Sequence, residues 1–319
     1  MKTSVTRMLE IDYPIVQGGL AHLAYARLCA AVSNAGGLGQ ISAATISGGP
    51  NGLRTEIRAV HALSDRPFAV NFAISGRRDI MDLVETALDE DVRVMSFTAG
   101  NPEPYLKRLE GTGVKTLVLV AGVRQAQKVE ELGGSAVIAV GYDGGGHLGR
   151  DDIGTMVLVP RILESVTIPV LASGGIGNGR GLAAALAMGA GGIEMGTRFV
   201  ATAECIAHTN YKMALVRANE TDTSIIERSL GTPGRVLKGV VSDHIIDLEA
   251  RNERDDVIAS ISGTVNKRGA IDGYLDEGWV WSGQVAGLIH DVPTVKELLD
   301  RMVAEAEQHL RDAADSFQD

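Results

Sequence analysis

A lone histidine, His147, directly follows three consecutive glycines in the segment GYDGGGHLG (141–149). An imidazole titrates near neutral pH, so a histidine at the mouth of a binding site can act as a base or bind an anion. Gly144 and Gly145 carry no side chains, and their bare backbone would let a flat ligand approach closely. The segment predicts a histidine that acts on a bound ligand; the alternative is a mobile turn with a surface histidine.

Two further glycine-rich segments are typical of anion sites. The segment ASGGIGNGRG (172–181) offers backbone N–H groups, including those of Gly174 and Gly175, next to an expected helix start. The segment EMGTRF adds the N–H of Gly196 and the hydroxyl of Thr197. Barrel enzymes often bind phosphate on the loops after strands seven and eight, so the two segments predict a phosphorylated cofactor. The acidic residue that would complete a Rossmann fingerprint does not follow.

Polar residues also occur in two earlier apolar runs, one of them inside its run and the other at the end. Asn71 is an amide inside FAVNFA, and either the backbone or a ligand must satisfy its hydrogen bonds. Gly18 and Gly19 follow Gln17 at the end of another run, and His22 comes shortly afterwards. The chain has no HxxxH, CxxC or clustered carboxylates to predict a metal site, and no GxSxG motif.

These residues need a scaffold that brings them to one face. Short apolar runs alternate with helix-like stretches from Pro14 to about Ala201, as in parallel sheets buried on both faces. Eight alternating units predict an α/β fold, a (β/α)₈ TIM barrel, with a doubly wound open sheet as the alternative. The expected strands are the runs 14–19, 37–42, 67–73, 92–100, 115–122, 136–144, 168–176 and 191–200.

The alternation stops after Phe199. Residues 201–281 are typical of helices and loops, so we expect a smaller inserted helical domain beside a barrel formed by residues 1–200. Residues 282–319 are expected to return to the barrel and to end in one long amphipathic helix.

Composition narrows the class of protein. The chain has 39 glycines in 319 residues, above the usual ~7%, and more than a third of them lie between Gly141 and Gly196. The net charge of −10 argues against nucleic acid or an anionic membrane as a partner.

We find no apolar signal segment and no run long enough to span a membrane. Cys29 and Cys205 lie far apart, which fits a reducing cytoplasm.

Several of these segments together resemble a known enzyme family. YPIVQGG, AVSNAGGLGQIS, PFAVNFA, GYDGGGHLG, IPVLASGGIGNGRG, MGTRF and WSGQVAGLI, in this order, are similar to the nitronate monooxygenase (2-nitropropane dioxygenase) family and to its relatives, the FMN-dependent enoyl-ACP reductases. The resemblance covers most of the barrel and is weakest over about residues 205–280. It implies an FMN-binding barrel with a small inserted helical domain.

The resemblance also implies roles for individual residues. His147 matches the histidine that the family places over the flavin, as a base or a substrate-orienting group. The residues expected at the flavin phosphate are Gly174, Gly175, Gly196 and Thr197, with Met195 in the same cofactor-binding set. The residues expected along the rest of the cofactor are Gly18, Gly19, Leu20, Asn71, Gly144 and Gly145.

Four positions depart from the family pattern. Asp143 stands where glutamate is common, and Val140 stands where many relatives have glutamine or glutamate. Leu20 replaces the usual methionine, and His22 adds an imidazole near the mouth. These departures are compatible with the FMN binding that the resemblance implies, but they bear on the choice of substrate.

Two reactions follow from the resemblance. In the first, alkyl nitronates reduce FMN, O₂ reoxidises it, and a carbonyl compound and nitrite are formed. In the second, NAD(P)H and FMN act on an enoyl or acyl thioester, as in a reductase or an acyl-CoA dehydrogenase. A barrel that binds a phosphorylated ligand without redox chemistry is the third alternative. The expected partners are a small-molecule substrate and O₂, or NAD(P)H for a reductase, with a homodimer as a further expectation.

Overall fold

The computed structural model describes residues 1–74 and 79–317, and its centre is one eight-stranded parallel sheet. The strands pair in the order β1-β9-β8-β6-β5-β4-β3-β2, and a parallel bridge between Val16 and Leu38 brings the two edges together. The sheet is therefore a nearly closed barrel, as predicted. Its strands are β1 (Ile15–Gln17), β2 (Gly39–Ser42), β3 (Phe68–Ala73), β4 (Val94–Thr98), β5 (Lys115–Val120), β6 (Ala136–Val140), β8 (Val170–Ser173) and β9 (Gly192–Met195).

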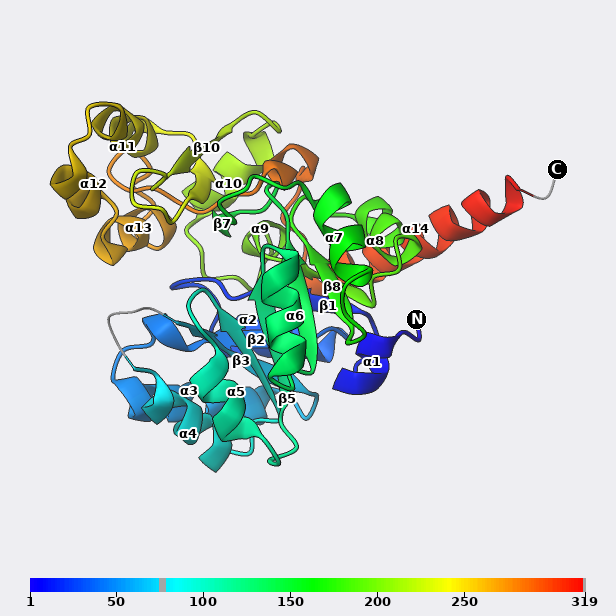
Figure 1. Cartoon of the computed structure of the whole chain (residues 1–319). Coiled ribbons are helices and arrows are strands. Elements are labelled where there is room, and N and C mark those ends of the chain that lie inside the picture. Colours follow the sequence, from blue (N-terminus) through cyan, green and yellow to red (C-terminus); the bar gives the residue numbers. More distant parts are fainter. Residues whose placement is uncertain (75–78, 318–319) are drawn as a thin grey trace.

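Helices cover the outside of the barrel, because each carries an apolar stripe at helical spacing. In α4, for example, Leu83, Val84 and Ala87 are buried while Asp82 lies in the first turn. Figure 1 shows these helices around the strands. They are α2 (Ala26–Asn34), α3 (Gly49–Leu63), α4 (Met81–Asp89), α5 (Glu103–Leu109), α6 (Val123–Glu131), α7 (Thr155–Leu163) and α8 (Gly179–Ala187), with the 3₁₀ turns η1 (Ala43–Thr45) and η2 (Gln284–Leu288).

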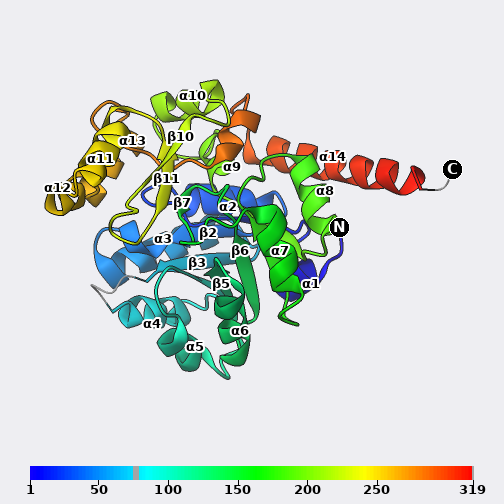
Figure 2. The ribbon, with the colours of Figure 1, turned by 45° about the horizontal axis from the view of Figure 1, so that its top comes forward.

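The eighth helical position is filled from the end of the chain. Helix α14 (Val295–Asp315) packs against α8 and α2, which lie on either side of it. It begins with a capping box between Thr294 and Glu297 and buries Leu298, Leu299 and Met302. Its last turns extend beyond the barrel (red in Figures 1 and 2). The expected long amphipathic helix is therefore a part of the barrel wall.

The lumen of the barrel changes character along its axis. Inward-facing residues near the amino-terminal ends of the strands are apolar, including Leu38, Ala69 and Leu117. Helix α1 (Ser4–Leu9) closes this end with Val5 and Leu9. Toward the carboxyl ends the inward positions become polar, and this change places hydrogen-bonding groups at one mouth of the barrel.

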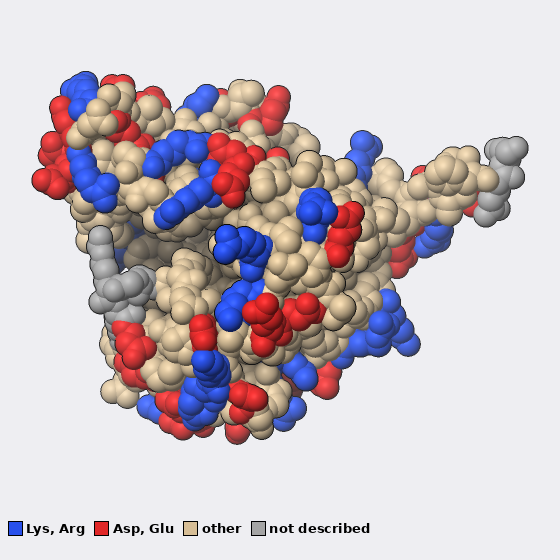
Figure 3. Space-filling model, viewed as in Figure 1, with Lys and Arg blue, Asp and Glu red and all other residues tan. Residues whose placement is uncertain are grey.

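A lobe lies beside the barrel, within the part of the chain where we expect the inserted domain (yellow in Figures 1 and 2). Tyr211 and Leu215, at the start of this part, pack in the core cluster of the barrel. The lobe has its own core, which includes Ile226, Val236, Ile245 and Trp279. It contains the expected helices, which are α10 (Thr209–Arg217), α11 (Val240–Ala250), α12 (Arg254–Ser260) and α13 (Gly263–Ala270), after the short α9 (Thr197–Val200). Figure 3 shows a hollow between this lobe and the barrel, with Lys and Arg side chains on part of its rim.

Sequence reasoning missed two strands in the lobe. β10 (Thr223–Ile226) pairs with β11 (Gly234–Leu237), and β11 pairs with the two-residue β7 (Gly146–His147), all antiparallel. Each strand is four residues or shorter, so none shows a period-two pattern long enough to predict. The expectation of helices and loops alone was therefore incomplete. The missed sheet connects the lobe to the glycine loop that carries His147.

The part of the chain that the structure describes contains no helix that is both long and apolar enough to cross a membrane.

Candidate functional site

His147 lies where the barrel meets the lobe. Its backbone is fixed by strand pairing, because it lies opposite Gly234 of β11. Its ring packs at 5.0 Å from the ring of Trp281, and 54% of its side chain is exposed. Nε2 of His147 lies 3.6 Å from Oε2 of Glu227. The imidazole is thus held on two sides and still open to solvent.

Glu227, the partner of His147, is a residue that sequence reasoning missed. It is buried, and its backbone is left-handed with φ of 66°. The Thr232 hydroxyl donates to its carboxylate at 3.2 Å, and the N–H groups of Leu230 and Thr232 donate to its carbonyl. A non-glycine residue in this conformation is strained and needs its surroundings to hold it. Glu227 lies in the part of the chain that matches no motif, so no signal in the sequence pointed to it.

The glycines before His147 have a packing role. A Cβ on Gly145 would lie 2.5 Å from the backbone nitrogen of Gly283, and one on Gly144 would lie 3.2 Å from the carbonyl oxygen of Gly141. The N–H of Gly283 in turn donates to the hydroxyl of Thr197 at 2.9 Å. The segment SGQ, which begins at Ser282, therefore packs directly against the glycine loop. This contact explains why glycine is needed at positions 145 and 283.

The two expected phosphate-binding loops are neighbours. Ser173 of β8 pairs with Glu194 of β9, so the loops that follow the two strands begin side by side. Gly174 and Gly175 have φ of 97° and 73°, the region that favours glycine. Two consecutive residues in this conformation turn the chain sharply, and the turn leads into the N-terminus of α8. Gly196 leads in the same way into the N-terminus of α9.

Thr197 and Met195 offer different groups to a ligand. The Thr197 oxygen already accepts from Gly283, so its hydroxyl hydrogen is the group that it can give. The Met195 side chain is buried in the core, and its carbonyl accepts from the N–H of Gly18 at 2.8 Å. Met195 therefore supports the site through its backbone.

Arg198, in the same motif, holds the end of the barrel to the C-terminal segment. Its buried guanidinium donates to the carbonyls of Ala201 at 2.6 Å and Asp291 at 2.8 Å. It also pairs with the Asp291 carboxylate at 3.1 Å. These bonds fix α9, on which Thr197 lies.

The loop after β1 lies across the mouth of the barrel. A Cβ on Gly19 would lie 2.2 Å from Oδ1 of Asn71, so only a glycine backbone fits over this amide. The N–H of Leu20 donates to the Ser42 hydroxyl at 2.8 Å, and a Cβ on Gly196 would lie 3.4 Å from the Leu20 side chain. The structure thus brings Gly19, Leu20 and Asn71, which are expected to bind the ring, close together. It also places Leu20 next to Gly196 of the expected phosphate-binding loops.

A connected polar layer lies beneath this loop inside the barrel. Nδ2 of Asn71 donates to Oγ of Ser96 at 2.8 Å, and Ser96 donates to Gln40. Nε2 of Gln40 donates to the carbonyl of Gln17 at 2.8 Å. Asn71 thus has a partner within the protein on its amide nitrogen, while its Oδ1 lies against Gly19.

Glu194 is the acidic member of this layer, and only 6% of it is exposed. The Ser173 hydroxyl donates to its carboxylate at 3.2 Å. Burial raises the pKa of Glu194 to about 7, although hydrogen bonds from Ser173 and Gln40 act in the opposite direction. Sequence reasoning passed over Glu194, but a charged residue inside the apolar strand GGIEM was a signal that could have found it.

Three of the residues that depart from the family pattern have clear surroundings in the structure. The Asp143 carboxylate accepts from both the N–H and the hydroxyl of Thr155 at 2.8 Å, so it caps the start of α7. Val140 is buried in the apolar cluster of the lumen. His22 has a left-handed backbone with φ of 64°, and burial, together with the charge of Lys267 on α13, lowers its pKa. His22 therefore lies near α13 of the lobe.

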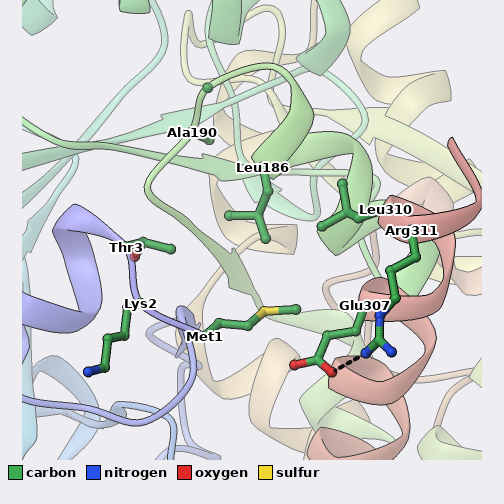
Figure 4. A pocket seen from close by; sticks show the side chains of 9 residues that line it. Met1, Lys2, Thr3, Leu186, Ala190, Glu307, Leu310 and Arg311 are labelled. Atoms are coloured by element: carbon green, nitrogen blue, oxygen red, sulfur yellow. Dashed lines mark hydrogen bonds and ion pairs between the residues drawn. The ribbon is translucent and has the colours of Figure 1, made fainter. Parts of the chain in front are cut away.

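A further cavity lies at the other end of the barrel. Figure 4 shows it between the first residues of the chain, the end of α8 and the last turns of α14, with a volume of about 600 Å³. An ion pair between Arg311 and Glu307 forms part of its wall. The amino-terminal ends of barrel strands contribute to stability in known enzymes, so this cavity is not the candidate active site.

Comparison with known proteins shows the family of the chain. The family model described as nitronate monooxygenase matches residues 2–83 and 73–305. The chain is 33% identical to the (3aS,4S,5R,7aS)-5-hydroxy-7a-methyl-1-oxo-octahydro-1H-indene-4-carboxyl-CoA dehydrogenase of Rhodococcus jostii, over 96% of both chains.

Two solved structures share the whole fold. FabK from Thermotoga maritima is 38% identical with a TM-score of 0.92, and the match covers 99% of each chain. The nitroalkane oxidase of Streptomyces ansochromogenes is 28% identical with a TM-score of 0.83, and the match covers 98% of this chain and 100% of that one. The chain is therefore an oxidoreductase that belongs to the nitronate monooxygenase family.

Proposed function

We propose that the chain binds FMN at the carboxyl ends of its barrel strands. The glycine geometry supports this fit. Gly174 and Gly175 are left-handed, and Gly196 leads into α9, so backbone N–H groups from two adjacent loops and the Thr197 hydroxyl would hold the phosphate. Gly18, Gly19, Leu20 and Asn71 would lie along the ring, with Gly144, Gly145 and Met195 supporting these loops.

We further propose that the enzyme oxidises alkyl nitronates, and that His147 forms them from nitroalkanes. Bound FMN would supply the electron acceptor for the substrate and the electron donor for O₂. The observation that carries the proposal is the half-exposed imidazole of His147 with the buried carboxylate of Glu227 at 3.6 Å. A carboxylate there offsets the charge of an imidazolium, so the pair suits proton transfer better than it suits holding an anion.

A second candidate is redox chemistry on an acyl thioester with NAD(P)H. The name of the Rhodococcus jostii relative, a carboxyl-CoA dehydrogenase, favours it. Such a substrate would bind in the hollow between lobe and barrel (Figure 3). The chemistry asked of His147 is related, because a thioester also acidifies the neighbouring C–H bond.

Product analysis separates the two candidates. FMN-loaded enzyme in air is given a nitroalkane, its preformed nitronate, or NADPH with an enoyl thioester. Nitrite formed from the nitronate supports the main proposal. Thioester reduction that depends on NADPH, without nitrite from either nitro compound, contradicts the main proposal and supports the second candidate.

Glu227→Gln is expected to slow turnover of a nitroalkane about tenfold with little change in KM. The amide keeps the shape of the side chain but removes the negative charge that faces Nε2 of His147 at 3.6 Å. A tenfold slower rate corresponds to about 1.4 kcal/mol in the activation free energy. Steady-state kinetics measures the effect. Glu131→Gln, at an exposed carboxylate on α6, is the matched control. Equal rates for the two variants would show that Glu227 does not act on His147.

Gly175→Ala is expected to weaken FMN binding about tenfold. A non-glycine residue in the left-handed region costs roughly 1–2 kcal/mol, and the new Cβ would lie 3.2 Å from Cβ of Asp143. Quenching of flavin fluorescence measures the affinity. Gly133→Ala is the control, because Gly133 is also left-handed (φ of 77°) but has open space at its Cβ. An unchanged affinity in Gly175→Ala would contradict the phosphate assignment.

A further inference from the structure

The proposed reaction leaves one buried ionisable group at the mouth of the barrel without a role. Glu194 lies at the end of β9, directly behind the loop expected to carry the flavin ring. A Cβ on Gly18 would lie 3.3 Å from the carboxyl carbon of Glu194, so the carboxyl group lies immediately beneath the Gly18 backbone.

The polar layer connects this carboxyl group to the same loop by a second route. Glu194 is hydrogen-bonded by Gln40, Gln40 accepts from Ser96, and Ser96 accepts from the Asn71 amide. Oδ1 of Asn71 lies against Gly19. The network therefore begins beneath Gly18 and ends beneath Gly19, on both sides of the point where the ring is expected.

The groups around the Glu194 carboxyl are neutral. The neighbours of this carboxyl group are Gly18, directly after β1, Gln40 of β2 and Ser173 of β8. Among the residues that the structure describes, no charged side chain contributes to the pKa of Glu194, and burial raises that pKa to about 7. A small change of charge nearby would therefore change its protonation near neutral pH.

We propose that Glu194 takes up a proton from solvent when the flavin above Gly18 and Gly19 becomes negatively charged on reduction. The inference rests on the proposed FMN binding. Reduction adds two electrons, from substrate or dithionite, and one proton to oxidised FMN, which leaves the ring with a negative charge. The Glu194 carboxylate then gains a second proton and becomes a neutral acid, so that two electrons and two protons enter the protein together. The repulsion between a buried carboxylate and the reduced ring is the physical cause.

The test is the pH dependence of the flavin midpoint potential in FMN-loaded enzyme. Above about pH 7, the wild type is expected to show a slope of two protons per two electrons. Glu194→Gln, which keeps the side-chain size and cannot titrate, is expected to show one proton per two electrons. Equal slopes in the two proteins would overturn the inference, and the exposed Glu131→Gln should match the wild type.

A second variant keeps the carboxyl group and changes only its surroundings. Ser173→Ala removes a hydrogen bond that stabilises the carboxylate, so the steep slope should begin at higher pH. An onset at the wild-type pH would contradict the assignment even if Glu194→Gln fails to fold. Protein that binds no FMN would overturn the proposed function and this inference with it, whereas bound FMN with equal slopes would overturn this inference alone.

Discussion

His147→Ala is expected to slow oxidation of a neutral nitroalkane by about 10²- to 10⁴-fold, the usual contribution of a general base. The same variant is expected to lose less than about tenfold on the preformed nitronate, because that substrate no longer needs a proton removed. The physical reason is the pairing of Nε2 with Glu227, which favours proton transfer over anion binding. Steady-state oxygen consumption with each substrate measures the two rates.

His309→Ala is the matched control for this variant, since His309 lies on the last turns of α14, away from the strands' carboxyl ends. Its rates should equal those of the wild type. An equal loss on nitroalkane and nitronate in His147→Ala would show that His147 binds the anion and is not the base. Flavin content is measured in both variants, so that loss of cofactor is not mistaken for loss of the base.

Glu194→Gln is expected to change the free energy of unfolding of the FMN-free protein by different amounts at pH 8 and at pH 4.5. The change at pH 8 should be more stabilising than the change at pH 4.5 by about 3 kcal/mol. The pKa of Glu194 is raised in the folded state from 4.5 to about 7. The neutral carboxyl group therefore makes its full contribution to the free energy of unfolding below about pH 4.5. This contribution is lost as the pH rises to about 7. Each pKa unit corresponds to about 1.4 kcal/mol, and glutamine does not titrate.

Urea unfolding of wild type and variant at both pH values measures this effect. Glu131→Gln, at an exposed position, should show no such pH dependence relative to the wild type. If the difference between Glu194→Gln and wild type is the same at both pH values, the carboxyl group is not a neutral acid in the folded protein near pH 7.

The barrel was predictable because its strands lie in short runs rich in Val, Ile or Leu, broken by few polar residues. A run such as KTLVLV is buried on both faces, so its hydrophobicity is visible without knowledge of its partners. β10 and β11 were not predictable for the opposite reason. They are four residues long, and β11 pairs with a two-residue strand inside a glycine loop about 90 residues earlier in the chain.

The candidate site also contains some residues that the sequence could predict and others that it could not. Backbone features such as the left-handed Gly174 and Gly175 leave a glycine signature that can be read from the sequence. Glu227 and Glu194 gain their chemistry from burial and from partners distant in the chain, which a single sequence does not show. The close packing of Gly145 against Gly283 is a further example, because it gives a packing reason for a glycine that the sequence associated with a ligand.

Anaerobic mixing of the FMN-loaded enzyme with propionate 3-nitronate tests the central claim most directly. We expect the oxidised flavin absorbance to bleach on mixing and to return when O₂ is admitted, with nitrite released. A flavin that stays oxidised with the nitronate, but bleaches with NADPH and is reoxidised by an enoyl thioester, would contradict nitronate oxidation as the function of this site.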